Sequence, residues 1–253
     1  MNITFLGTGT SQGVPVIGCN CEVCRSLDFR DKRLRTSIHL LVDHKNIVID
    51  TGPDFRQQML REDITDLDAV VYTHEHKDHT AGLDDIRPYN FKHQKDLPIF
   101  GRNTVIDQIK QEFSYIFSAN SYPGVPRVVV NEINNSPFYV EGIPFIPIEV
   151  YHHKLPVFGF RIKDFTYITD ANHIADEELE KIYGTKVLVL NALRLKPHIS
   201  HFTLEEAINL IKKIKPERAF LTHISHQMGI HRKAEKLLPE GIHLAHDGLK
   251  INL

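Results

Sequence analysis

Apolar residues follow two kinds of spacing along the chain, and together they predict a fold of strands and helices. Short runs of mostly apolar, often β-branched residues indicate buried strands, whereas apolar residues three or four positions apart indicate helices packed on one face. The expected strands lie near residues 2–7, 36–42, 46–50, 69–73, 143–151, 157–162, 165–169, 186–191, 218–222 and 242–246, and the expected helices near residues 53–62, 176–183 and 203–214. Because both halves follow the same plan, we expect an α/β architecture with two facing β-sheets and helices outside.

Residues 85–126 have the least regular pattern of the chain. The segment is rich in aromatic residues, among them Tyr89, Phe91, Phe113 and Tyr115. These side chains suit a lid, a subunit contact in a homodimer, or ordinary packing of helices, and the sequence leaves all three open.

The size and composition of the chain predict one compact unit. With 253 residues and 42% hydrophobic composition, the chain can bury a large core. Sandwiches of strands and helices of this length usually form one domain. Since no low-complexity linker, charge block or repeat divides the sequence, we expect a single domain over residues 1–253.

The charge distribution and the N-terminus restrict the partners and the location that we expect. The formal net charge is −2 and the cationic residues are dispersed, so no basic stripe indicates an extended nucleic-acid surface. Residues 1–6 begin a strand directly, without the basic and apolar regions of a signal peptide, and no stretch approaches membrane-spanning length. We therefore expect a cytoplasmic protein that does not contact a membrane.

The most informative motif is the segment Thr-His-Glu-His-Lys-Asp-His at residues 73–79. His74 and His76 are two positions apart, so in extended chain leaving a strand their imidazoles point the same way and can bind one ion. Asp78 and His79 follow where the chain should turn into a helix, and they can reach a second ion. Although the chain has 16 histidines, isolated surface histidines would not explain the aspartate between them. The motif predicts a dinuclear metal hydrolase.

This motif resembles the His-x-His-x-Asp-His motif of the metallo-β-lactamase superfamily, and the resemblance extends over nearly the whole chain. It implies a four-layer αβ/βα sandwich and three further ligands, each after a strand-like run. The first is His152 or His153, of which we prefer His152 although His153 stands where the family commonly has glycine. The others are Asp170, which would bridge the two ions, and His223.

The resemblance therefore implies a complete set of ligands. One ion would be bound by His74, His76 and His152, the other by Asp78, His79 and His223, with Asp170 between them. Asp50, after the run at residues 47–49, is interpreted as an acceptor that orients one ligand imidazole, or alternatively as a turn-capping aspartate. The ligand types suit zinc, manganese or iron, and the sequence does not choose among them.

All three cysteines fall within six residues, at Cys19, Cys21 and Cys24. This spacing is more typical of metal binding than of disulfides, and three thiolates need a fourth ligand for a closed zinc site. His226, three residues after His223, is the natural candidate. We therefore predict a structural zinc, against the alternative of three merely buried or reactive cysteines.

The Cys-x-Cys-x-x-Cys segment combined with His-x-x-His near the C-terminus is similar to the PhnP-like phosphodiesterases. Three further segments resemble the same group, at residues 7–15, 82–88 and 200–207. The resemblance implies that His201 faces the metal pair and acts as proton donor or oxyanion partner, although a histidine in solvent is the alternative. Thr203 and Glu206 have the spacing of a capping box, which predicts a helix that starts just after His201.

The function that the resemblance implies is hydrolysis of a small cyclic phosphodiester, such as a phosphoribosyl 1,2-cyclic phosphate or a related cyclic nucleotide. A hydroxide between the ions would attack phosphorus in line, with Asp78 and His201 as the catalytic residues. The same ligands serve thioester hydrolysis in glyoxalase-type relatives, and a tRNA 3′-processing endonuclease shares the phosphodiester chemistry. The absence of a long Gly- and Lys-rich insertion disfavours the endonuclease.

Overall fold

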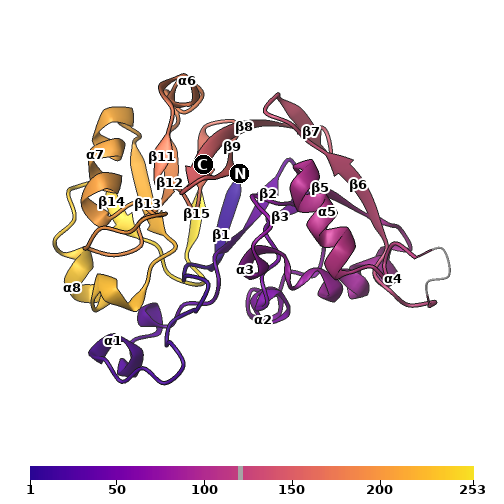
Figure 1. The fold of residues 1–253 in the computed structure, drawn as a ribbon, viewed down its shortest axis with the longest axis horizontal. Coiled ribbons are helices and arrows are strands. Elements are labelled where there is room, and N and C mark those ends of the chain that lie inside the picture. The colour runs from indigo at the N-terminus through magenta and orange to yellow at the C-terminus, as the bar shows by residue number, and fades with distance from the viewer. Residues whose placement is uncertain (119–121) are drawn as a thin grey trace.

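Two β-sheets pack face to face and carry helices on their outer faces. The computed structural model describes residues 1–118 and 122–253 (Figure 1). The first sheet has the order β15-β1-β2-β3-β4-β5-β6 and the second the order β11-β8-β9-β10-β12-β13-β14, with β7 paired to β8. This confirms the predicted α/β sandwich.

The strands of the first sheet are β1 (Asn2–Gly7), β2 (Ser37–Val42), β3 (Lys45–Ile49), β4 (Ala69–Val71), β5 (Leu97–Gly101), β6 (Val128–Glu132) and β15 (Lys250–Asn252). Those of the second are β7 (Phe138–Val140), β8 (Ile143–His152), β9 (Leu155–Ile162), β10 (Phe165–Ile168), β11 (His173–Ile174), β12 (Val187–Asn191), β13 (Arg218–Thr222) and β14 (Ile242–Leu244). Strands β3 to β6 run parallel, and so do β10, β12, β13 and β14.

The α-helices are α1 (Glu22–Arg25), α2 (Phe55–Arg61), α3 (Lys77–Thr80), α4 (Arg87–His93), α5 (Asn103–Glu112), α6 (Asp176–Leu179), α7 (Leu204–Ile214) and α8 (His231–Glu235). Short 3₁₀ turns are η1 (Phe29–Asp31), η2 (Leu83–Ile86) and η3 (His226–Met228). Helix α7 starts with the predicted capping box of Thr203 and Glu206. None of the described helices has the length and apolar character that crossing a bilayer requires.

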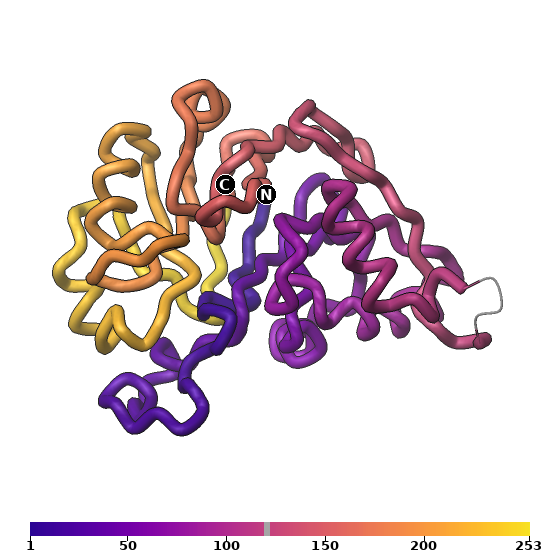
Figure 2. Tube along the Cα trace, viewed as in Figure 1, coloured from indigo at the N-terminus to yellow at the C-terminus, as the bar shows by residue number. Residues whose placement is uncertain are grey.

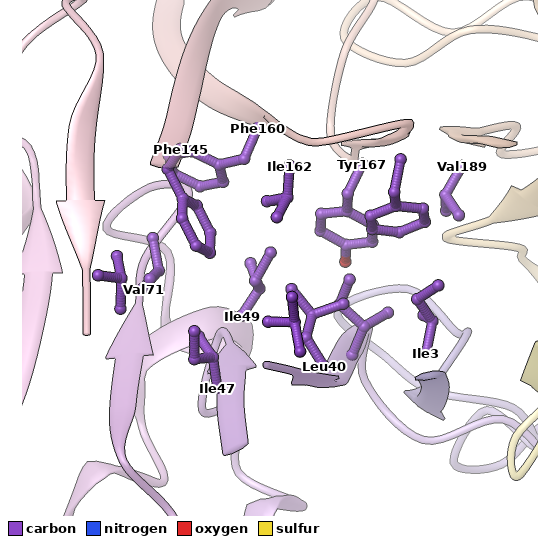
Figure 3. Close-up of a cluster of buried hydrophobic side chains, with 14 of the residues drawn as sticks. Ile3, Leu40, Ile47, Ile49, Val71, Phe145, Phe160, Ile162, Tyr167 and Val189 are labelled. Carbon is purple, nitrogen blue, oxygen red and sulfur yellow. The ribbon is translucent and has the colours of Figure 1, made fainter. Parts of the chain in front are cut away.

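The strands are apolar on both faces. Each sheet therefore packs against the other sheet on one face and against helices on the other. Along β12, Val187 and Val189 pack between the two sheets, whereas Leu188 and Leu190 pack under α7. Figure 3 shows side chains of both sheets meeting, with Ile162 of the second sheet facing Ile49 of the first. A further cluster lies between the first sheet and α2, α4 and α5. These clusters account for the predicted four layers.

The N-terminal segment that carries the cysteines lies outside these layers. In the tube view it extends below the two sheets as a separate arm that includes α1 (Figure 2). The fully buried Arg33 connects the arm to the body, since its Nη1 donates to Thr8 Oγ1 and to Ala245 O, each at 2.7 Å. Its Nη2 contacts His231 Nδ1 at 3.0 Å.

The expectation that residues 85–126 are the least regular part was wrong for most of the segment. It contains α4, β5 and α5, and β6 follows it in the first sheet. Tyr89 and Phe113 pack in the cluster under these helices, while Phe91 and Tyr115 are exposed. Residues 119–121 of this segment lie outside the described residues. Many positions in these short elements are polar, so the sequence pattern did not indicate their apolar faces.

Candidate dinuclear metal centre

Three of the predicted site residues occupy tight turns immediately after strands. Asp50 follows β3, Asp170 follows β10 and His223 follows β13, with φ values of 68°, 55° and 53°. This left-handed conformation is unfavourable for residues other than glycine, and such local strain often marks functional sites. These turns lie at the carboxyl ends of strands that run parallel to their neighbours, β3 in the first sheet and β10 and β13 in the second.

The motif at residues 73–79 leaves β4 and enters α3, as its pattern predicted. His74 Nε2 lies 3.1 Å from His76 Nδ1, so the two imidazoles converge. Asp78 and His79 occupy the first turn of α3, and the His79 ring lies 4.2 Å from the His74 ring. Rigid elements on both sides of the motif therefore fix its four polar side chains.

The structure brings His152 to this cluster and leaves His153 outside it. The His152 ring lies 5.9 Å from that of His74 and 5.2 Å from that of His76. Its Nδ1 lies 2.8 Å from the Ser200 carbonyl, so Nδ1 must donate and the Nε2 lone pair stays free for a ligand bond. His153 is exposed at a turn with φ of 58°, and its backbone N–H bonds Asn172.

Asp170 lies at the centre of the cluster and is only 2% exposed. Its Oδ1 lies 3.1 Å from His223 Nε2, and its Oδ2 lies 3.3 Å from His79 Nε2. Asp78 Oδ2 lies 3.3 Å from the same His79 nitrogen and 4.0 Å from His223 Nε2. Both of these imidazoles belong to one predicted ligand set, but a ligand atom of Asp170 also lies within 4.8 Å of one on His74 and of one on His152, so the carboxylate is within reach of both sets.

The cluster has the charge and the unpaired atoms that divalent cations would satisfy. Among the described residues, His79 Nε2, both ring nitrogens of His223 and His201 Nδ1 are buried without a hydrogen-bond partner. Burial alone would lower the pKa of His79, but Asp78, Asp170 and Asp50 raise it well above its usual range. Two ligands on one tetrahedral zinc are ~3.4 Å apart, close to the observed separations between nitrogen and oxygen. These residues therefore fit a pair of divalent cations.

Asp50 lies beneath the cluster and orients His79. Both side chains are fully buried, and Asp50 Oδ2 lies 2.7 Å from His79 Nδ1. Asp50 also accepts from the backbone N–H and the hydroxyl of Thr73, each at 2.9 Å. The bond makes Nδ1 the donor of His79, which leaves Nε2 free to bind metal.

His201 is buried beside the cluster and does not face solvent, so that alternative reading was wrong. It is 8% exposed, and its ring lies 4.7 Å from His223 and 4.5 Å from His152. Its Nδ1 lies 3.9 Å from Asp170 Oδ1. Burial and the neighbouring His223 lower the pKa of His201 to about 2, so its imidazole is neutral at neutral pH.

The cysteines converge with His226 in a second, separate cluster. Cys19 Sγ and Cys21 Sγ each lie 3.4 Å from His226 Nδ1, and Cys24 Sγ lies 3.6 Å from it. Sulfur and nitrogen ligands of one tetrahedral zinc are ~3.6 Å apart, so these atoms fit a structural zinc. The backbone N–H of Cys24 and the His226 ring lower the pKa of Cys21 to about 6, which favours its thiolate.

A cavity of about 290 Å³ connects the two clusters. Its walls include His201 and His223 from the first cluster and His226 from the second. The remaining lining residues are Thr10, Ser11, Gln12, Leu193, Arg194, His198, Ser225 and Gln227. A substrate whose reactive atom lay at the first cluster would extend into this cavity.

Sequence reasoning missed two residues of this site, Arg194 in the wall of the cavity and Thr73 beside Asp50. Arg194 stands in Leu193-Arg194-Leu195-Lys196-Pro197, which has the composition of a surface loop. Thr73, which holds Asp50, has no signal of its own beyond its place next to His74. Only the position of these residues in space indicates a role, because no spacing rule connects them to the ligands.

Comparisons with known proteins agree with this geometry. Residues 45–224 match the family model of the beta-lactamase superfamily domain. A solved structure described as a new diphosphatase from the PhnP family is 40% identical, with a TM-score of 0.93 over 100% of this chain and 97% of that one. The fold and the site thus define a metal-dependent hydrolase with the metallo-β-lactamase fold. The chain belongs to the beta-lactamase superfamily and, within it, to the PhnP family.

The curated relatives are longer proteins. The octanoyltransferase of Porphyromonas gingivalis is 42% identical over 253 residues, which are 99% of this chain and 51% of that protein. Ribonuclease Z of Nanoarchaeum equitans is 27% identical over 179 residues, 65% of this chain and 55% of the relative. The chain therefore spans about half the length of the curated relatives that it matches.

Proposed function

We propose that this protein is a phosphodiesterase that hydrolyses a small cyclic phosphodiester, such as a phosphoribosyl 1,2-cyclic phosphate or a related cyclic nucleotide. The observation that carries the proposal is the position of His201, buried between His152 and His223 and next to Asp170. Thioester hydrolysis releases a thiolate, which needs no proton donor to depart. An alkoxide leaving group does need such help.

Two divalent cations in this cluster would supply a nucleophilic hydroxide at neutral pH and would stabilise the charge that develops on the phosphoryl oxygens. Asp170 would lie between them, with Asp78, His79 and His223 on one side and His74, His76 and His152 on the other. Asp50 and the Ser200 carbonyl hold His79 and His152 in the tautomers that leave Nε2 free. The choice among zinc, manganese and iron stays open, and we propose zinc for the cysteine cluster.

His201 would act on the oxygen that leaves. Its neutral imidazole can donate an N–H bond to a developing oxyanion. The negative charge of a bound phosphodiester would raise the pKa of His201, since an opposite charge favours the protonated ring. We therefore propose that His201 acts on this oxygen as proton donor or as hydrogen-bond donor to the oxyanion.

The test is the replacement His201→Ala with substrates of different leaving groups. The kcat for a cyclic phosphodiester with an alkoxide leaving group should fall by ~10²–10⁴-fold. The loss should shrink for bis(p-nitrophenyl) phosphate, because p-nitrophenolate needs little protonation. Equal losses with both substrates would contradict His201 as the proton donor.

Diphosphate hydrolysis is a second candidate, because the PhnP-family structure with 40% identity is described as a diphosphatase. A phosphoanhydride links two phosphorus centres through one oxygen, and hydrolysis likewise attacks phosphorus and releases an oxygen leaving group, so the same residues could serve it. A tRNA 3′-processing activity has more distant support, from relatives named ribonuclease Z that are 27% and 28% identical. Thioester hydrolysis is the alternative from another class of reaction. The relative named octanoyltransferase does not decide the activity of this chain, because the chain spans about half of that protein.

A further inference from the structure

The side chain of Asn191 connects two strands beyond the point where their backbone pairing ends. The parallel ladder of β10 and β12 runs as far as the pair Ile168 and Leu190. The chain then turns away at Asp170, whose φ of 55° is incompatible with an extended strand. Asn191, the last residue of β12, bonds Ala171 through its side chain. The amide therefore continues the connection between the two strands past the turn.

Asn191 binds both backbone polar groups of Ala171. Its Oδ1 accepts from the Ala171 N–H at 2.8 Å, and its Nδ2 donates to the Ala171 carbonyl at 2.9 Å. Both residues are fully buried. Because a backbone N–H only donates and a carbonyl only accepts, the pairing fixes which way the amide points. The N–H belongs to the peptide unit that joins Ala171 to Asp170, so the bond restricts the backbone at Asp170 directly.

The Ala171 carbonyl also connects this turn to His201. It accepts from the Phe202 N–H at 2.8 Å as well as from Asn191, so both of its lone pairs are used. Phe202 directly follows His201, whose Nδ1 lies 3.9 Å from Asp170 Oδ1. A shift of the Ala171 carbonyl would therefore move the imidazole and the carboxylate relative to each other.

The next residue of the turn, Asn172, connects it to His152. The Asn172 N–H donates to the Tyr151 carbonyl at 2.8 Å, and Asn172 Oδ1 accepts from the His153 N–H at 2.7 Å. Tyr151 and His153 are the two neighbours of His152 in the chain. The turn is thus bonded to the backbone beside two other residues of the site.

We propose that Asn191 is a positioning residue of the dinuclear centre. By holding Ala171, it fixes the left-handed turn that places the Asp170 carboxylate between the two ions and next to His201. The inference rests on the proposed function, because it assumes a metal pair at this cluster. Asn191 would contact neither an ion nor the substrate, so its effect on hydrolysis passes through Asp170 and His201.

A matched pair of variants separates this role from a contribution to stability alone. Asn191→Ala leaves the two buried backbone groups of Ala171 without the amide. Asn90→Ala is the control, since the 3% exposed Asn90 makes the same two bonds to Arg127, each at 2.9 Å. Asn90 belongs to α4, at the right of Figure 1, whereas β12 lies left of its centre. Both variants should lower the thermal midpoint, and only Asn191→Ala should alter the metal pair.

Titration with Mn²⁺, followed by electron paramagnetic resonance, measures the pair without turnover, because two manganese ions that share a bridging carboxylate are magnetically coupled. The wild-type protein and Asn90→Ala should show coupled ions. In Asn191→Ala, Mn²⁺ binding should weaken by ~10–100-fold, as is common when a residue that orients a ligand is lost, and the coupled signal should decrease. Asn191→Ser, which leaves room for water to reach Ala171, should show a smaller effect of the same kind and decides the question if Asn191→Ala does not fold.

The kinetic effect of Asn191→Ala should appear in kcat more than in KM. Displaced Asp170 and His201 would weaken interactions with the attacking and leaving oxygens, which are strongest in the transition state. For a cyclic phosphodiester, kcat should fall by up to ~10²-fold, as a misplacement of about 1 Å in an active site can cause.

The positioning role and the proposed function fail in different ways. Coupled ions at wild-type affinity in the Asn191 variants, an equal loss in Asn90→Ala, or no coupled ions in the wild-type protein would overturn the positioning role. If the Asn191 variants lose the coupled pair but the wild-type protein cleaves no diester, the proposed function is wrong and the positioning role stands. If the wild-type protein cleaves diesters and the variants keep the pair, the reverse holds.

Discussion

Asp50→Asn should remove metal from the dinuclear centre although Asp50 would not touch an ion. In the wild-type structure, Asp50 Oδ1 accepts from the backbone N–H of Thr73, a donor that cannot reverse. The Asn amide oxygen would keep this bond, so its NH₂ group would replace Oδ2 and face the Thr73 hydroxyl and His79 Nδ1. The hydroxyl can rotate to accept. His79 can accept at Nδ1 only if its proton moves to Nε2.

That change of tautomer blocks the nitrogen that faces Asp78 and Asp170. Loss of such a supporting bond commonly lowers metal affinity by ~10–100-fold. This corresponds to ~1.4–2.7 kcal/mol of binding free energy. Asp50→Ala would be a poorer test, since three donor groups would lose their acceptor at ~1–3 kcal/mol each and folding itself could fail.

The assay is competitive metal titration against a chelator of known affinity, with metal content measured after desalting. Asp247→Asn is the matched control, because Asp247 is also buried and accepts from Thr8 and Leu34 without contacting a predicted ligand of the pair. The control should retain both ions even if its thermal midpoint falls. Two ions held by Asp50→Asn at wild-type affinity would refute the tautomer argument.

Three further predictions follow from other parts of the structure. Asp170→Ala should empty or scramble the pair and reduce activity by orders of magnitude, because the two ions would lose the carboxylate proposed to lie between them; elemental analysis that still finds two tightly held ions would exclude a bridging role. Cys21→Ser should lose one zinc per chain and lower the thermal midpoint while the dinuclear ligands remain, and full zinc with unchanged melting would contradict the Cys₃His site. Burial and Arg33 lower the pKa of His231 to about 4, below its ordinary value of ~6.5. As the pH drops, His231 therefore becomes protonated in the unfolded chain before it does in the folded protein, so the free energy of unfolding should fall between about pH 6.5 and about pH 4. His231→Gln keeps an acceptor for Arg33 without titrating, so its melting temperature should depend less on pH in this window; parallel curves for the two proteins would disprove this origin.

The sequence revealed those parts of the site that local spacing determines. His74, His76, Asp78 and His79 lie within six residues, so their convergence follows from one strand end and one helix turn. The sequence favoured His152 over His153, and the structure brings His152, the last residue of β8, to the cluster and leaves His153 in the turn beyond the strand.

Features that depend on long-range packing could not be predicted. Arg194 reaches the cavity because its backbone pairs with residues 202–204 and its guanidinium bonds Gln227. Nothing in the composition of its loop signals either contact. The helices and strand in residues 87–112 were missed for a related reason, since many of their positions are polar and their apolar faces are defined by the first sheet.

If a pair of metal ions in this cluster makes the protein a phosphodiesterase, hydrolysis of a panel of substrates should depend on those ions. Protein loaded with a defined metal would be assayed on a cyclic phosphodiester, a phosphoanhydride, a phosphomonoester, a thioester and precursor tRNA, with ions per chain counted in the same samples. We expect the cyclic phosphodiester to have the highest kcat/KM and its turnover to require both ions of the dinuclear centre. Faster hydrolysis of the thioester, or full activity without ions in this centre, would contradict the account.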